Sequence, residues 1–185
     1  MSIRLRLTLL YSSILALTLL LFGTFLYFFL QYTLLKEMDT VLSNKAVEVF
    51  NSIKITHSYP YLLQQVVLPD VDIFTAAPDV FLQVIDRQGQ IVAKSSNLGS
   101  QGLPVNQETV LQAAQKGAFY QTFTLKQGKL RTYNLPLYLD ENLVGIIQVG
   151  RPLETISGAL KSLKLVLLTG TSLALLLAAS TGYAM

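Results

Sequence analysis

Very few side chains in this sequence could carry out covalent chemistry. The chain has no cysteine and a single histidine, His57, so disulfides, thiolate metal sites and thiol nucleophiles are excluded. Histidine titrates near neutral pH, but one imidazole without a second ligand is usually solvated or locally bonded. Asp70, Asp72 and Asp79 lack the spacing of a calcium-binding loop and are expected to be solvated. We therefore predict no catalytic residue, no metal and no cofactor in this polypeptide.

Five polar residues are candidates for binding a small ligand. Arg131 and Tyr133 lie in one predicted strand, Gln83 lies in another, and Ser96 and Asn97 belong to a loop. A planar guanidinium donates hydrogen bonds in pairs, so Arg131 is suited to hold a carboxylate or a phosphate. The alternative is that Arg131 is an exposed strand residue, and the sequence leaves both interpretations open.

Two long apolar runs flank these residues. Residues 7–35 and 165–185 contain no Asp, Glu, Lys or Arg. Because a helix rises about 1.5 Å per residue, some 20 apolar residues cross a hydrocarbon layer of about 30 Å. We therefore predict transmembrane helices at 7–33 and 161–185. A cleaved signal peptide is the alternative for the first run, but the run is far longer than the apolar region of a signal peptide.

The basic residues before the first span predict its orientation. Arg4 and Arg6 precede the apolar run, and positive charge favours the cytoplasmic side of a membrane. Residues 1–6 are therefore expected in the cytoplasm and residues 34–160 outside it. This describes a multi-pass protein of the cell membrane in contact with lipid.

Small residues recur along both predicted spans. Small side chains let two helix backbones approach closely, so a role in helix packing is predicted. The pattern does not distinguish packing within one subunit from packing across a homodimer. The residues are Gly170, Ala174, Ala178 and Gly182 in the second span, and Ser12 and Ala16 in the first.

The region between the spans predicts one α+β domain. An apolar stripe at spacings of three and four predicts a long helix over 34–56, which packs on its own domain or also pairs with a second subunit. Within the mixed α/β region 79–150, runs of β-branched and aromatic residues separated by turn residues predict antiparallel strands. The expected strands are 80–86, 91–94, 118–125, 130–138 and 143–150.

Two further helices are expected in or next to this region. Asn106 is suited to cap a helix at 105–116, in which Val110, Leu111 and Ala114 are expected to face inward. Pro152 fits the first turn of a helix, so we predict that the sheet passes into the second span at this residue.

Several segments carry a resemblance to a known family. They are Ile3–Arg6, Val84–Val92, Ser95–Leu98, Leu103–Pro104 and Gly145–Leu153. With them, the whole chain resembles the sensor region of bacterial two-component histidine kinases. The resemblance implies a PAS-like fold of the PDC/Cache type, with an antiparallel five-stranded sheet and a long N-terminal helix between two transmembrane helices. It also implies a homodimer and output through a cytoplasmic linker called HAMP.

The resemblance leads to an expected function. The chain would detect an unknown small-molecule or protein stimulus outside the cytoplasm and transmit it through the second span to a kinase. That kinase, its ATP and Mg²⁺, and its response regulator would belong to sequence beyond residue 185, because no Gly-rich phosphate loop or cytoplasmic histidine occurs here. The sensor of a chemoreceptor or cyclase, and a non-signalling scaffold subunit, remain alternatives. A net charge of +3 without a basic stripe makes nucleic acid an unlikely partner.

Overall fold

The computed structural model describes residues 3–52, 79–126, 128–139 and 142–184. The chain divides into two compact units. We call Met1–Lys36 with Thr155–Met185 the helical unit and Glu37–Glu154 the sheet unit.

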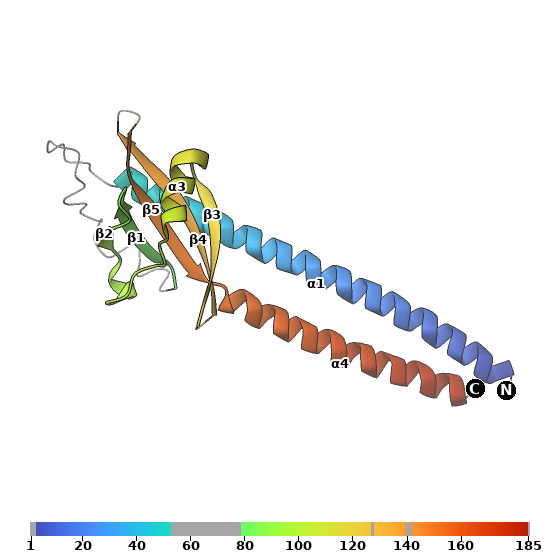
Figure 1. The fold of residues 1–185 in the computed structure, drawn as a ribbon. Helices are drawn as coiled ribbons and strands as arrows, with labels where there is room; N and C mark the ends of the chain where they lie inside the picture. The colour runs from blue at the N-terminus through green and yellow to red at the C-terminus, as the bar shows by residue number, and fades with distance from the viewer. Residues whose placement is uncertain (1–2, 53–78, 127, 140–141, 185) are drawn as a thin grey trace. The chain divides into compact units, whose positions relative to one another are not determined.

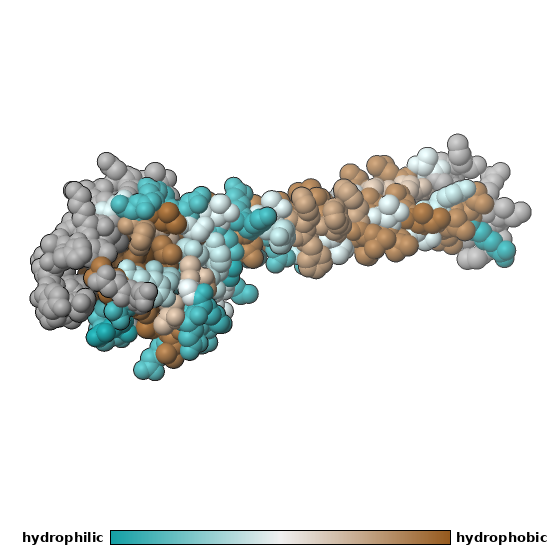
Figure 2. Space-filling model, turned by 90° about the horizontal axis from the view of Figure 1, so that it is seen from above, coloured by the Kyte–Doolittle hydropathy of each residue, from teal (hydrophilic) through white to brown (hydrophobic). Residues whose placement is uncertain are grey.

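The helical unit contains the first part of α1 (Ile3–Ser52) and almost all of α4 (Glu154–Ala184), which lie side by side (Figure 1). At Gly23 a Cβ atom would lie 3.7 Å from Leu167 Cδ1, so the two helices pack closely there. Large apolar side chains cover most of the outer surface, which is largely brown in Figure 2, and Leu168 is 68% exposed. By length and hydropathy, both helices are candidates for membrane spans.

α1 continues without a break into the sheet unit and ends at Ser52. The apolar run and the predicted helix 34–56 therefore form one helix as far as Ser52, and residues 53–56 lie outside the described residues. Within the sheet unit, the predicted apolar stripe is buried. Of the predicted stripe Leu35, Met38, Leu42, Ala46, Val49 and Ile53, the members in the described part of this unit are Met38, Leu42, Ala46 and Val49.

The sheet unit confirms the predicted α+β fold with a five-stranded antiparallel sheet. The order across the sheet is β2-β1-β5-β4-β3, so the last strand in the sequence is the central one. A short 3₁₀ helix, η1 (Ser96–Leu98), follows β2. The elements are β1 (Phe81–Asp86), β2 (Ile91–Lys94), α3 (Gln107–Lys116), β3 (Phe119–Leu125), β4 (Gly128–Leu139) and β5 (Asn142–Pro152).

The two faces of the sheet carry different helices. Ala113 of α3 packs against Ile85 and Ile146, and we call this side the α3 face. Successive strand residues point to opposite faces, and Arg131 of β4 is opposite Arg151, five residues after Ile146 in β5. Arg131 therefore points to the other side of the sheet, where it contacts Asp39 of α1. We call this side the α1 face.

The sidedness of α3 differs from the prediction. Asn106 caps the helix as expected, accepting a hydrogen bond from the Thr109 amide at 2.8 Å. Thr109 and Ala113 are the buried residues, whereas Leu111 is 59% exposed. The prediction that Leu111 and Ala114 face inward is therefore wrong; the side of the helix that packs on the sheet contains Ala113, which contacts Ile85 and Ile146 in the core.

The prediction that a helix begins at Pro152 is also wrong. Pro152 is the last residue of β5 and pairs with Leu130, and α4 begins at Glu154. The Leu153 amide donates to the Lys129 carbonyl at 2.8 Å, so sheet pairing continues past the proline. A proline can end a strand because its fixed φ fits extended backbone. The strand loses only one hydrogen bond, since proline has no backbone N–H to donate.

Candidate functional site

On the α3 face, two buried glutamines hold a loop against the sheet. The Gln83 side chain accepts from the Leu103 amide at 2.8 Å and donates to the Leu103 carbonyl at 3.0 Å. It also donates to Gln148 Oε1 at 2.7 Å, and Gln148 donates to the Pro104 carbonyl at 3.3 Å. Both glutamines are fully buried, so these bonds fix the segment that leads into α3.

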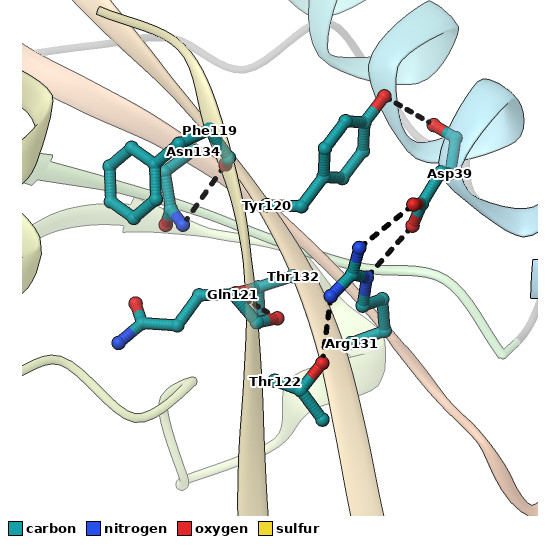
Figure 3. Close-up of polar contacts among 8 residues, drawn as sticks. All are labelled: Asp39, Phe119, Tyr120, Gln121, Thr122, Arg131, Thr132 and Asn134. Carbon is teal, nitrogen blue, oxygen red and sulfur yellow. Dashed lines mark hydrogen bonds and ion pairs between the residues drawn. The ribbon is translucent and has the colours of Figure 1, made fainter. Parts of the chain in front are cut away.

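Beside these glutamines, β4 presents a buried acceptor to the α3 face. Asn134 is opposite Gln148 in the β4–β5 register and is fully buried. Its Nδ2 lies 3.5 Å from the Phe119 carbonyl, and among the described residues its Oδ1 has no hydrogen-bond partner. Figure 3 shows Asn134 and Gln121 on one side of β3 and β4 and Arg131 on the other. A buried amide oxygen of this kind is commonly satisfied by an ordered water.

On the α1 face, Arg131 forms a bidentate ion pair with Asp39. Its Nε and Nη2 lie 2.8 Å from Asp39 Oδ1 and Oδ2, and its Nη1 donates to Thr122 Oγ1 at 2.9 Å (Figure 3). Tyr120 donates to the Asp39 carbonyl at 3.0 Å, and its ring centroid lies 5.2 Å from the guanidinium carbon. The two charged side chains are only 19% and 20% exposed. The contact therefore fixes α1 to β3 and β4.

Tyr133 lies next to this ion pair. Its ring centroid is 4.7 Å from that of Tyr120. Burial raises the pKa of the Tyr133 phenol above its ordinary value, and the neighbouring Tyr120 adds to the shift. Tyr133 is therefore a neutral residue at physiological pH.

A second ion pair lies at the end of β5. Arg151 is opposite Arg131 in the β4–β5 register, and its Nε lies 2.6 Å from Asp79 Oδ2. Like charges opposite each other on adjacent strands repel. This repulsion is reduced here because each arginine pairs with its own carboxylate. Asp79, predicted to be solvated, is thus an ion-pair partner with a 40% exposed side chain.

The loop candidates lie near the start of β1. Asn97 donates to the Val80 carbonyl at 2.8 Å and accepts from Ser95 Oγ at 2.6 Å, whereas Ser96 is exposed. These contacts attach η1 to β1.

The five predicted ligand residues therefore do not form one cluster. Arg131 and Tyr133 lie on the α1 face, Gln83 lies on the α3 face, and Ser96 and Asn97 lie in η1. Their ligand-binding role stays a prediction. The sequence analysis missed Asp39, Gln148 and Asn134; polar residues at alternate positions of a strand with buried neighbours were the available signal for Asn134.

The small residues of the helical unit have different surroundings. Ser12, Ala16, Ala174 and Ala178 are partly buried, whereas Gly170 is exposed with open space where a Cβ would be. Gly182 lies in α4, but its surroundings are outside the described residues.

Some candidate residues lie outside the described part of the chain, namely His57, Asp70 and Asp72. Among the described residues, no group of three or more His, Cys, Asp or Glu is placed to hold a metal ion.

An antiparallel five-stranded sheet with a long N-terminal helix on one face and a short helix on the other is the predicted PAS-like architecture of the PDC/Cache type. The chain belongs to the single Cache domain family, because residues 40–164 match the family model described as single Cache domain 3. It therefore contains a Cache-type sensor domain of a signalling protein.

Solved structures similar to the chain include two domains of bacterial receptors. One is the ligand-binding domain of the Campylobacter jejuni chemoreceptor Tlp3 in complex with L-valine, with a TM-score of 0.48 and 15% identity; the match covers 82% of this chain and 65% of that one. The other is the sensor domain of the zinc-responsive histidine kinase CzcS from Pseudomonas aeruginosa, with a TM-score of 0.32 and 12% identity, covering 63% of this chain and 94% of that one. No curated protein sequence matches the chain.

Proposed function

We propose that this chain is the sensory and transmembrane module of a bacterial two-component sensor histidine kinase. The observation that carries the proposal is the junction between β5 and α4. The central strand of a Cache sheet ends at Pro152, and after a single intervening residue, Leu153, an apolar helix begins that is long enough to cross a membrane. A change in the sheet can therefore reach the bilayer through a single stretch of backbone.

In this proposal α1 and α4 both cross the cell membrane, the N-terminus is cytoplasmic and the sheet unit is outside. Exposed leucines over both helices support the membrane assignment, because an apolar surface of this extent is unfavourable in water. Arg4 and Arg6 support the orientation. The small residues, including Gly170 and Ala174, would pack helices within a homodimer as well as within one subunit.

The stimulus in this proposal is a small molecule or protein recognised at the sheet unit. The candidates for its recognition are polar side chains of this unit, namely Gln83, Ser96, Asn97, Arg131 and Tyr133. A ligand would favour one of two arrangements of the sheet and α4 by its difference in affinity for them. A HAMP linker, a kinase with ATP and Mg²⁺, and a response regulator would act after α4.

Cysteine labelling and phosphorylation test the proposal. Because the chain has no cysteine, the substitution Ser96→Cys at an exposed position gives a single thiol. A membrane-impermeant maleimide should label it in intact cells, and labelling only after permeabilisation would contradict the orientation. The natural polypeptide that contains this chain should then incorporate phosphate from ATP on histidine. Phosphate on a separate, receptor-bound kinase would indicate a chemoreceptor instead.

A further inference from the structure

We infer that the first four residues of β4, Gly128 to Arg131, couple α1 to the start of α4. We call this segment the β4 bridge. The inference rests on the proposed function, in that coupling matters only if α4 carries a signal. It identifies where, within the sheet unit, the two helices are joined.

One end of the β4 bridge holds α1. All three nitrogens of the Arg131 guanidinium are engaged, two by the Asp39 carboxylate and one by Thr122. The guanidinium group is planar and its two hydrogen bonds to the carboxylate have a fixed geometry. Residue Asp39 of α1 therefore cannot rotate or slide without breaking at least one of these hydrogen bonds. The hydrogen bond from Tyr120 to the Asp39 backbone adds a second attachment.

The other end of the β4 bridge holds the start of α4. The Lys129 carbonyl accepts from the Leu153 amide at 2.8 Å, immediately before the helix. Gly128 has a φ of +139°, and a Cβ atom at this position would overlap the Glu154 carboxylate. The first residue of α4 therefore lies against the backbone of β4.

Charge links the two ends. Arg131 and Arg151 are opposite each other on adjacent strands, and Arg151 precedes α4 by three residues. When Asp39 moves away, Arg131 loses its neutralising partner and repels Arg151. A displacement of α1 therefore changes the electrostatic repulsion at the end of β5 as well as the contacts of β4.

Hydrogen exchange of the full chain in lipid nanodiscs tests this inference. Asp39→Asn and Arg131→Gln each remove the ion pair, and we expect the Leu153 amide and the first turn of α4 to exchange about tenfold faster, which corresponds to about 1.4 kcal/mol. The double variant should exchange no faster than the more severe single variant, because both remove one interaction. Lys45→Gln is the matched control, since it breaks an exposed ion pair on α1 with Glu48, and Leu153 should then exchange as in the wild type.

Unchanged exchange at Leu153 in both ion-pair variants would overturn the inference. If either variant fails to fold, Arg131→Lys keeps the charge but loses the bidentate pair, and exchange should still rise about threefold. Equal exchange in Arg131→Lys and Lys45→Gln would also overturn it. The measurement needs neither stimulus nor output. Failure of the inference is therefore distinct from failure of the proposed function, which the Ser96→Cys label reports.

Discussion

Replacement of Gln83 by leucine should destabilise the sheet unit strongly. Although Gln83 is fully buried in a strand, its side-chain amide makes three hydrogen bonds, two with the Leu103 backbone and one with Gln148. Leucine has a similar volume but none of these polar groups. The Leu103 amide and carbonyl would then be left without their partner in a buried position.

The size of the effect follows from these contacts. Each lost hydrogen bond contributes about 0.5–1.5 kcal/mol, and a buried backbone group left unsatisfied costs about 1–3 kcal/mol. Greater burial of apolar surface by leucine offsets roughly 1 kcal/mol. We therefore expect a loss of about 3 kcal/mol, a large fraction of the roughly 5–15 kcal/mol that stabilises a typical domain.

Urea unfolding of the full chain in detergent micelles, followed by tyrosine circular dichroism, measures this loss, and hydrogen exchange at Leu103 locates it. Gln112→Leu is the matched control, because the Gln112 amide bonds only to the exposed Glu108 carboxylate among the described contacts. That control should stay within about 0.5 kcal/mol of the wild type. A Gln83→Leu protein within 1 kcal/mol of the wild type, with Leu103 still protected, would refute the reasoning.

Two further predictions concern β4. Gly128→Ala should destabilise the chain by about 2 kcal/mol in urea unfolding, because a side chain there needs a strained φ and meets Glu154. Adding Glu154→Ala should recover part of this loss, and no recovery would contradict the contact. Tyr133→Phe should reduce the fall in thermal stability that occurs as the pH rises above about 10. Since burial raises the pKa of folded Tyr133, its contribution is complete below the unfolded pKa of 10.0 and is lost as pH rises through the folded pKa. Parallel melting curves would contradict this.

Local features of the fold could be predicted because short-range chemistry determines them. The predicted turn after β1 is confirmed: Asp86 accepts from the Gln88 and Gln90 amides, and Gly89 takes a φ of +81°. The cap at Asn106 is confirmed for the same reason. In each case the side chain that forms the structure lies within a few residues of the backbone it bonds.

Long-range partners could not be predicted in this way. The sequence analysis considered Arg131 for its ability to bind a carboxylate of a ligand; in the structure it forms a bidentate pair with Asp39, 92 residues earlier in the sequence, and its ligand-binding role stays a prediction. The side of α3 that is buried contains Ala113, whose core partners Ile85 and Ile146 lie on two other elements of the chain. The spacing of apolar residues along the sequence does not predict such contacts, because the two partners come together only through the register of the strands.

The register also places two kinds of contact on one strand. Asn134 points to the α3 face, and three residues earlier Arg131 points to the α1 face and holds Asp39. Both side chains therefore lie on the same strand whose first residues contact Leu153. Because β4 pairs along almost its whole length with β5, a small shift of this strand cannot be absorbed locally. The contacts of the α3 face and the ion pair that holds α1 therefore share one strand, β4.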